Sequence, residues 1–162
     1  MSEADYSETL PPFGLLAELD EVVRGILAKA GRLETLPVET RIATQGTSHR
    51  TLCVLLSGKA SVYCHAHGDY VHIADIKPGE TIGEMNMIDP QHASADVTIT
   101  EKARVWIIEV EQFQSIVQQD PVTAYAVLEW LARELCRRLR RNADHMLRQA
   151  EEHRNHMRDM DY

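Results

Sequence analysis

The sequence predicts a mainly β protein of the α+β class, an antiparallel β-barrel or jelly roll with an N-terminal helix and a long C-terminal helix. Between Leu33 and Glu109, short runs rich in valine, isoleucine and threonine alternate with turn residues, a pattern typical of sandwiches and barrels. Before and after this region, apolar residues recur at helical spacing. A chain of 162 residues is long enough to bury the core of one such domain and to carry one additional element.

The first predicted element is a helix over residues 15–30, which follows a polar tail of residues 1–13 and ends at Gly31. The strand region consists of runs enriched in β-branched residues, namely TLCVLL (51–56), KASVYC (59–64), YVHIADI (70–76), ADVTI (95–99) and RVWIIEV (104–110). Turn segments such as SG, HGD, KPGE and TEKA separate these runs. We therefore expect each run to form its own strand.

A second helical region follows the strands. The stretch EQFQSIVQQDP (111–121) predicts a short helix that ends at Asp120 and Pro121, and a long helix then begins near Val122. The chain therefore divides into the N-terminal tail, a barrel with flanking helices over 14–121, and the C-terminal helix with its tail over 122–162.

The composition is ordinary for a globular protein, with 44% hydrophobic and 26% charged residues. The formal net charge of −8 argues against a chain that wraps nucleic acid. No apolar run approaches the roughly 20 residues of a membrane span, and the acidic N-terminus is unlike a secretory signal. The three cysteines, Cys53, Cys64 and Cys136, form no CxxC pair. We expect a cytoplasmic protein with reduced thiols and no membrane partner.

One loop, PGETIGEMNMIDPQHASADV (78–97), has the features of a ligand-binding loop. Its glycines free the backbone to turn tightly and to approach a ligand, and Glu84 follows Gly83 as an acceptor. However, no lysine or arginine occurs between Lys77 and Lys102. The loop therefore raises the question of what would neutralise the charge of an anionic ligand.

These residues resemble the cyclic nucleotide-binding domain, the family that includes catabolite activator proteins, regulatory subunits of cAMP-dependent kinase and cyclic nucleotide-gated channels. The resemblance covers roughly residues 14–145. It is carried by IATQGTSHRTLCVLLSGKASVY, IADIKPGETIGEMNMID and RVWIIEVEQFQSIV, and by the turn glycines and the glutamate at the family's positions, which are Gly46, Gly58, Gly79, Gly83 and Glu84. The resemblance implies a stand-alone sensor domain that binds cAMP, cGMP or a related nucleotide and signals to a partner protein.

The phosphate-binding part of this loop departs from the family pattern of proline, arginine, serine, alanine, threonine and valine. The aligned residues are His92, Ala93, Ser94, Ala95, Asp96 and Val97. The arginine that pairs with the cyclic phosphate in the family is Ala93 here, and loss of one such contact costs about 2–5 kcal/mol. Asp96 would repel an anion if it pointed into the pocket. A helix around 84–88 and a protonated His92 could compensate in part.

The resemblance implies a ligand site made by Gly83, Glu84, Met85, His92, Ala93, Ser94 and Asn142. Glu84 is expected to accept a hydrogen bond from the ribose 2′-hydroxyl. Ser94 and backbone N–H groups are expected to donate to the phosphate, and Asn142 to contact the base. Arg140 or Arg141 could replace the missing loop arginine, since both lie beside Asn142 in the sequence.

The long C-terminal stretch shows a heptad pattern that is apolar in its first half and polar in its second, with the residues Leu128, Leu131, Leu135, Leu139, Asn142, Met146, Gln149, His153, His156 and Met160. This pattern predicts a homodimer formed through the C-terminal helix. A single polar Asn142 in this seam could fix the register of the two helices. The alternative is a helix that lies on its own barrel.

Other function classes remain as alternatives. The chain given stops at Tyr162, without the helix-turn-helix of the family's transcription factors, so we expect no direct DNA binding. A ligand-free, dimeric protein-interaction module is the second reading. A cupin-like metal enzyme is a distant third, suggested by His65, His67 and His72 and by a second set in the tail, His145, His153 and His156. No nucleophile motif is present, so we expect no enzymatic activity and no cofactor.

Overall fold

The computed structural model describes residues 6–66 and 68–160, except for the side chains of residues 145, 149 and 152–160. The chain forms two compact units, one extending through Trp130 and the other beginning at Leu131. No helix in the described part of the chain combines the length and the apolar character needed to cross a membrane.

The N-terminal region contains two short helices where the sequence predicted one. A 3-10 helix, η1, spans Gly14–Glu18, and the α-helix α1 spans Glu21–Ala30. The chain is extended at Leu19, and the side chain of Asp20 accepts a hydrogen bond of 2.8 Å from the backbone of Val23. The prediction of one continuous helix was therefore wrong, because an aspartate in this position caps a new helix.

The fold is a six-stranded antiparallel sheet with the central order β1-β6-β3-β4. Strand β2 pairs with β6, and β5 pairs with β3. Their bounds are Arg32–Leu36 for β1, Arg41–Ala43 for β2, Thr51–Ala66 for β3, Asp69–Ile76 for β4, Thr81–Ile82 for β5 and Asp96–Glu109 for β6. This mainly antiparallel architecture with helices at both ends confirms the predicted fold class.

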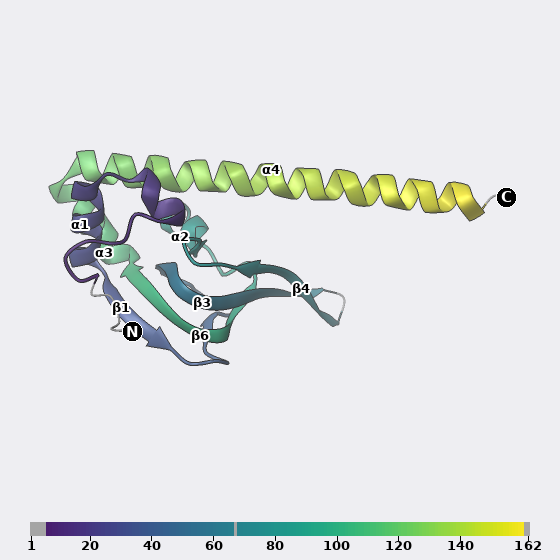
Figure 1. Ribbon diagram of the computed structural model, residues 1–162, viewed down its shortest axis with the longest axis horizontal. Coiled ribbons are helices and arrows are strands. Elements are labelled where there is room, and N and C mark those ends of the chain that lie inside the picture. The colour runs from purple at the N-terminus through teal and green to yellow at the C-terminus, as the bar shows by residue number, and fades with distance from the viewer. Residues whose placement is uncertain (1–5, 67, 161–162) are drawn as a thin grey trace. The chain divides into compact units, whose positions relative to one another are not determined.

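Two long strands replace four of the predicted runs. The runs 51–56 and 59–64 belong to the single strand β3, and the runs 95–99 and 104–110 belong almost entirely to β6 (Figure 1). The ladder between β3 and β6 shifts its register around Ser57 and Lys59, so both strands bend there together. Gly58 is required at this bend, because it has φ +83° and an added Cβ would lie 2.4 Å from the carbonyl oxygen of Lys102.

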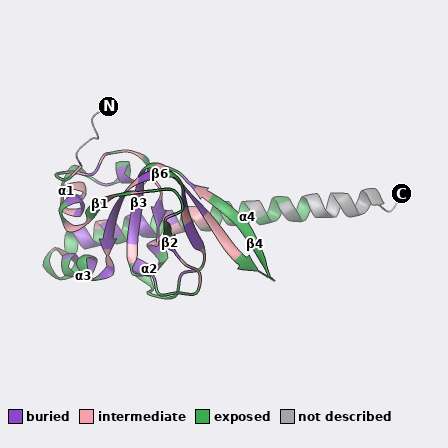
Figure 2. Ribbon diagram, turned by 90° about the horizontal axis from the view of Figure 1, so that it is seen from below, coloured by how far each residue is buried: buried purple, intermediate pink, exposed green. Residues whose placement is uncertain are grey.

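The sheet closes around an apolar interior. We call the face that carries this interior the inner face, and its buried core residues include Ala43, Cys53, Leu55, Ala60, Ile76, Ile82, Ala93, Val97, Ile99, Ala103, Val105 and Ile107. Side chains alternate along a strand, so residues such as Tyr63 and Asp96, which pair with each other across β3 and β6, project from the opposite, outer face. Strand β4 is largely exposed (Figure 2).

Three helices complete the chain: α2 over Glu84–Ile88, α3 over Val110–Gln119 and α4 over Pro121–Met160. Within the first unit, the indole Nε1 of Trp130 donates to the carbonyl of Leu15 at 2.8 Å. The backbone N–H of Leu15 in turn donates to Gly79 at 3.0 Å. The N-terminal 3-10 helix is thereby attached both to the start of α4 and to the turn that leads into the predicted ligand loop.

Candidate ligand-binding site

Within the predicted loop of residues 78–97, the candidate site residues occupy positions 83–94, which we call the ligand loop. This part begins with a glycine that no other residue could replace without strain. Gly83 is the N-cap of α2 and has φ +86°, in the left-handed region that favours glycine. An added Cβ would lie 2.2 Å from the carbonyl oxygen of Thr51 and 2.6 Å from Nε2 of His49. The absence of a side chain therefore lets the loop pass directly against the start of β3.

Glu84 places a carboxylate at the start of α2. Its exposed fraction is 3%, and Oε2 accepts a hydrogen bond of 3.3 Å from the hydroxyl of Thr81, which is itself fully buried. Buried carboxylates are rare in proteins unless they are paired or functional. This arrangement fixes an acceptor in the position where the sequence predicted the ribose-binding group.

The next residues of α2 differ in their exposure to solvent. Met85 is exposed, with 53% of its surface accessible, whereas Asn86 is buried. The amide of Asn86 donates to the carbonyl of Gln91, so the helix is tied to the second half of the ligand loop. The predicted short helix over 84–88 is confirmed, and its buried asparagine is a loop-closing residue that the sequence did not indicate.

The residue at the family's arginine position is buried in the interior. Ala93 is 7% exposed and belongs to the inner-face core. Its backbone N–H donates to Thr47 at 2.8 Å, and its carbonyl accepts from Gly46 at 2.8 Å. A longer side chain at this position would therefore start on the inner face, and the N–H of Ala93 is already used within the protein.

The neighbours of Ala93 point elsewhere. His92 is exposed and forms an isolated β-bridge with Ser48. Ser94 is also exposed, and its carbonyl accepts a hydrogen bond of 3.7 Å from the thiol of Cys64. The predicted loop residues all belong to the first unit, in which Glu84 and Ala93 are buried and Met85, His92 and Ser94 are at the surface.

Asp96 projects from the outer face, not into the interior. Its carboxylate accepts from the backbone N–H of Gln45 at 2.7 Å and from the hydroxyl of Tyr70 at 3.1 Å. Nε2 of His65 lies 3.5 Å away and Arg41 lies 3.9 Å away. The hydrogen bond from Gln45, followed by those of its other partners, lowers the pKa of Asp96. The negative charge therefore does not face a ligand bound inside the barrel.

A second carboxylate on the outer face, that of Asp75, also has several hydrogen-bond partners. Asp75 contacts Lys59 at 2.7 Å, Ser61 at 2.7 Å and His72 at 2.9 Å. Hydrogen bonds from Lys59, Ser61 and His72, in that order, hold the pKa of Asp75 far below its usual range. Between Asp75 and Asp96, the ring of Tyr70 stacks on that of a neighbouring tyrosine, Tyr63, at 4.8 Å.

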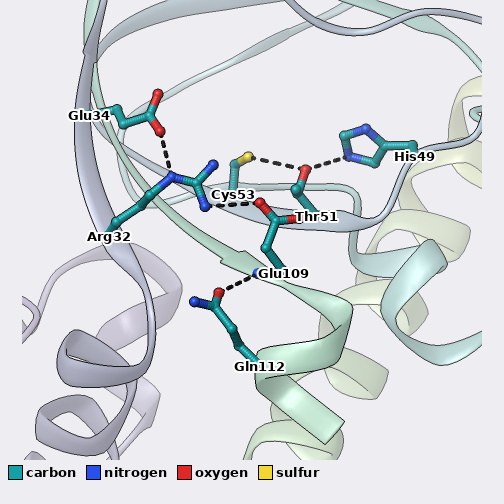
Figure 3. A network of polar contacts seen from close by, with 7 residues as sticks. All are labelled: Arg32, Glu34, His49, Thr51, Cys53, Glu109 and Gln112. Atoms are coloured by element: carbon teal, nitrogen blue, oxygen red, sulfur yellow. Dashed lines mark hydrogen bonds and ion pairs between the residues drawn. The ribbon is translucent and has the colours of Figure 1, made fainter.

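A further polar network lies at the start of β3 and joins several elements (Figure 3). The hydroxyl of Thr51 is 3.2 Å from Nε2 of His49, and the thiol of Cys53 donates to it at 3.9 Å. Burial raises the pKa of Cys53 to about 12, so its thiol stays protonated and inert. The same burial lowers the pKa of His49, against smaller opposing effects of Thr51 and Glu109.

The network continues from β1 to the first turn of α3. Arg32 donates to Glu34 at 2.6 Å and to Glu109 at 2.9 Å. The backbone N–H of Glu109 donates to the side chain of Gln112 at 2.9 Å, as part of a capping box at the start of α3. Sequence reasoning missed this network because its members come from residues 32, 49 and 109, which only the folded sheet brings together.

The remaining predicted residues belong to the second unit. Asn142 and Arg140 are exposed on α4. Arg141 donates to Glu134 at 2.9 Å, and Arg138 donates to the same carboxylate oxygen at 3.1 Å. Glu134 is only 2% exposed. Arg141, one of the two arginines predicted to compensate for Ala93, is thus engaged with a glutamate of its own helix.

Among the described residues, no group of three or more histidine, cysteine, aspartate or glutamate side chains could hold a metal ion. His65 and His72 instead contact Asp96 and Asp75. His67 lies outside the described residues, as do the side chains of His145, His153 and His156. The metal hypothesis can therefore be compared with the structure only at His65 and His72.

Comparison with known proteins identifies the family of the domain. Residues 33–120 match the model of the cyclic nucleotide-binding domain family, so the chain belongs to that family of regulatory ligand-binding domains. The cyclic AMP receptor protein of Thermus thermophilus is 30% identical over 92 residues, which are 56% of this chain and 43% of that protein. The chain thus spans less than half the length of this curated relative.

Solved structures share the fold. A cyclic nucleotide-binding domain from Methylobacillus flagellatus superposes with a TM-score of 0.77 at 22% identity, over 81% of this chain and 74% of the other. The catabolite activator protein of Thermus thermophilus superposes with a TM-score of 0.66 at 25% identity, over 85% of this chain and 62% of the other. The family expected from the sequence is confirmed.

Proposed function

We propose that this protein is a cytoplasmic, non-enzymatic sensor that binds cAMP, cGMP or a related nucleotide in the ligand loop and transmits binding to a partner protein through α4. The observation that carries the proposal is the buried carboxylate of Glu84, held by Thr81 at the start of α2. A carboxylate in this position is an acceptor for a ribose hydroxyl, and a buried acceptor of this kind discriminates strongly for a ligand that supplies the donor.

The residues that would surround the phosphate differ in what they offer. Ser94 is exposed and has a hydroxyl donor, whereas Ala93 offers only a methyl group within the apolar interior. A cyclic nucleotide therefore gains less from this loop than from one that carries arginine, and its affinity depends more on the ribose and the base. In the proposal, Asn142 contacts the base, and Arg140 or Arg141 supplies positive charge when a nucleotide is bound.

Isothermal titration calorimetry tests the proposal. Titrations of the full chain with cAMP, cGMP and cyclic di-GMP are compared with titrations with adenosine and guanosine, which share the ribose and base but lack the phosphate. We expect saturable binding of at least one of these compounds and its loss in the Glu84→Ala variant. The Glu101→Ala variant, at an exposed position of β6, is the matched control and should bind as the wild type does.

Two results would contradict the proposal. Absence of heat with every compound at millimolar concentration would show that the loop is not a nucleotide site. Equal binding by wild type and a folded Glu84→Ala variant would show that any ligand binds elsewhere.

We also propose that α4 forms a homodimer with a second copy of itself. Several apolar residues of this helix are exposed, including Leu128, Leu139, Met146 and Leu147, and three of them occupy positions of the predicted heptad seam. Exposed leucine and methionine at such spacing pack well against an identical helix. Sedimentation equilibrium should show a dimer that Leu139→Glu dissociates, while Asp144→Lys, outside the seam, leaves it intact. A monomeric wild type would contradict this part of the proposal.

The alternative function is a ligand-free interaction module that uses the barrel as a scaffold. The specific observation in its favour is Ala93, whose methyl group and backbone hydrogen bonds belong entirely to the protein interior. The calorimetric titrations separate the two functions, because an interaction module should bind none of the five compounds.

A further inference from the structure

The segment of residues 46–51, which we call the connecting segment, contacts both ends of the ligand loop. At the far end of the loop, the backbones of Gly46 and Thr47 each share a hydrogen bond of 2.8 Å with Ala93. Near the same point, Ser48 forms the β-bridge with His92. At the near end, the carbonyl of Thr51 and the ring of His49 lie against Gly83.

The same segment is also attached to the first turn of α3. The carbonyl of Arg50 accepts from the backbone N–H of Val110 at 2.9 Å. The guanidinium of Arg50 donates twice to one carboxylate oxygen of Glu111, at 2.9 and 2.6 Å. Any displacement of the connecting segment must therefore move the ligand loop, α3 or both.

His49 occupies the centre of these contacts. It is 8% exposed, although its neighbours Ser48 and Arg50 are exposed. The space for its ring exists only because residue 83 has no side chain, since a Cβ there would lie 2.6 Å from Nε2 and 3.0 Å from Cδ2. The ring therefore supports the backbone of the loop directly before Glu84.

The surroundings of His49 favour its neutral form. The ring is removed from water, and the Thr51 hydroxyl beside it carries no charge. The carboxylate that acts on it, Glu109, is already bound by Arg32. The charged or titratable groups on the elements around it are Glu109 and Arg32 at the sheet edge, Cys53 in β3, Glu84 in α2, Glu111 paired with Arg50 in α3, and His92 opposite Ser48. A proton added to the ring would be costly in this environment.

We propose that His49 is a positioning residue that, in its neutral form, holds Gly83 and Glu84 in the binding geometry, and that its protonation loosens the contacts of the connecting segment with the ligand loop and with α3. This inference rests on the proposed function for its effect on ligand binding, but not for its effect on the loop itself. The protein would then bind its ligand more weakly at mildly acidic pH. If only the neutral form is competent, Kd rises up to about tenfold for each pH unit below the midpoint of His49.

Amide hydrogen exchange of the ligand-free full chain tests the effect on the loop. Exchange rates, corrected for their intrinsic pH dependence, are compared at pH 8 and pH 5.5 for residues 81–95 and for the N–H of Val110, with the β3–β6 ladder around Val62 as the internal reference. We expect protection of the loop and of Val110 to fall at pH 5.5 in wild type and to be independent of pH in His49→Gln. The carboxamide of this variant can hydrogen-bond Thr51 but carries no charge.

His72→Gln is the matched control, since it removes a histidine from the outer face, and it should behave as wild type. The proposal is overturned if wild type shows no pH effect in the loop or if His49→Gln keeps the whole effect. If His49→Gln does not fold, the NMR titration of the His49 ring in wild type replaces it. The ring midpoint must then coincide with the loss of protection, and a different midpoint would overturn the proposal.

A second arm uses cAMP as the probe at pH 8 and pH 5.5, the values of the exchange experiment. We expect weaker binding at the lower pH in wild type and equal binding at the two values in His49→Gln. If cAMP does not bind at pH 8, the same comparison is made with whichever of the five compounds binds. Binding of none contradicts the proposed function alone, because the exchange experiment still decides the role of His49.

Discussion

The two faces of the β3–β6 sheet favour opposite charge states of their titratable groups: ionised groups on the outer face and neutral groups on the inner face. On the outer face, hydrogen bonds from Gln45 and from Lys59 lower the pKa values of Asp96 and Asp75, which therefore stay ionised. At the inner, buried side of the start of β3, burial lowers the pKa of His49 and raises that of Cys53 to about 12. Both of these groups are therefore neutral near pH 7.

This difference shows why alanine at the family's arginine position, residue 93, matters for the binding of an anion. Ala93 and Asp96 are three residues apart, but the first lies in the inner core and the second on the outer face. On the outer face, the positively charged guanidinium of Arg41 lies 3.9 Å from the carboxylate of Asp96. A phosphate inside the barrel has no such partner at position 93 in the first unit, so affinity for an anion there must come from elsewhere.

The largest expected effect comes from restoring the family's arginine. Ala93→Arg should raise the affinity for cAMP about 30-fold to several thousand-fold, because a charge-assisted contact in a partly buried pocket contributes about 2–5 kcal/mol. Isothermal titration calorimetry measures the change. Ala66→Arg, at the exposed end of β3, should leave the affinity unchanged, and adding Glu84→Ala should abolish the gain. A folded Ala93→Arg variant with wild-type affinity would show that position 93 does not face the ligand.

The next largest effect concerns the stability of the ligand loop. Gly83→Ala should lower the free energy of unfolding by about 3 kcal/mol, through its positive φ and the contact with Thr51. Gly46→Ala is the matched comparison, since Gly46 has φ +78° but nothing within 4 Å of an added Cβ, and its loss should be about 1 kcal/mol. Urea denaturation measures both values. Equal losses would mean that the close approach of the loop to β3 does not matter.

A smaller loss is expected on the outer face. Asp96→Asn should lower stability at pH 7 by about 1–3 kcal/mol, because the backbone of Gln45 loses a charged acceptor. A carboxylate with a lowered pKa contributes stability above its ordinary pKa and loses it as the pH falls through its folded value. The variant should therefore lose less stability than wild type as the pH falls below about 4. Asp69→Asn, in the exposed hairpin, should not alter this dependence.

The smallest change is predicted for the Tyr70 hydroxyl. Tyr70→Phe removes one donor from Asp96 but leaves the shorter bond from Gln45. Its effect on stability should be smaller than that of Asp96→Asn, and the pKa of Asp96 should rise toward its ordinary value. Carboxyl NMR titration measures this pKa, and a value unchanged in the variant would show that Tyr70 contributes nothing to the ionisation of Asp96.

Protonation of His49 should lower stability in a pH range above the one in which the aspartates titrate. Its folded pKa is lowered by burial, so its contribution to stability is present above about pH 6.5, the ordinary pKa of histidine, and is lost as the pH falls. Wild type should therefore lose stability as the pH falls below about 6.5, before the aspartates titrate. Thermal unfolding of His49→Gln should show a weaker dependence in this window. The same slope in both proteins would assign the loss to other histidines.

The local features of the fold could be predicted from the sequence because they depend on neighbouring residues. The β-branched runs and the start of the long helix follow from composition and spacing, whereas the helix over 84–88 was implied by the family resemblance of the loop. The joining of the predicted runs into β3 and β6 did not follow, because Ser57-Gly58 and residues 100–103 resemble turns. In the folded sheet the ladder continues through these segments, with Ser57 paired to Arg104 and Lys59 paired to Glu101. Likewise, Asp20 reads as a polar residue of one amphipathic helix, whereas it caps a second one.

The candidate site was predictable only in part, for the same reason. Glu84 and its glycine stand in one continuous loop that a sequence motif can reveal. The support of this loop by His49 could not be predicted, because it arises from a contact between residues 49 and 83 that no local pattern encodes. A polar stretch directly before an apolar strand, SHRT at 48–51, was the only local indication that this segment contacts more than solvent.

The most direct test of the central claim, that a nucleotide binds at the inner face beside the ligand loop, is an NMR titration of the labelled wild-type protein with millimolar cAMP. We expect chemical-shift changes centred on the amides of Gly83, Glu84 and Ser94, with Tyr63 and Tyr70 on the outer face unchanged. Shifts confined to the outer face, or no shifts with either cAMP or cGMP in a parallel titration, would contradict this claim.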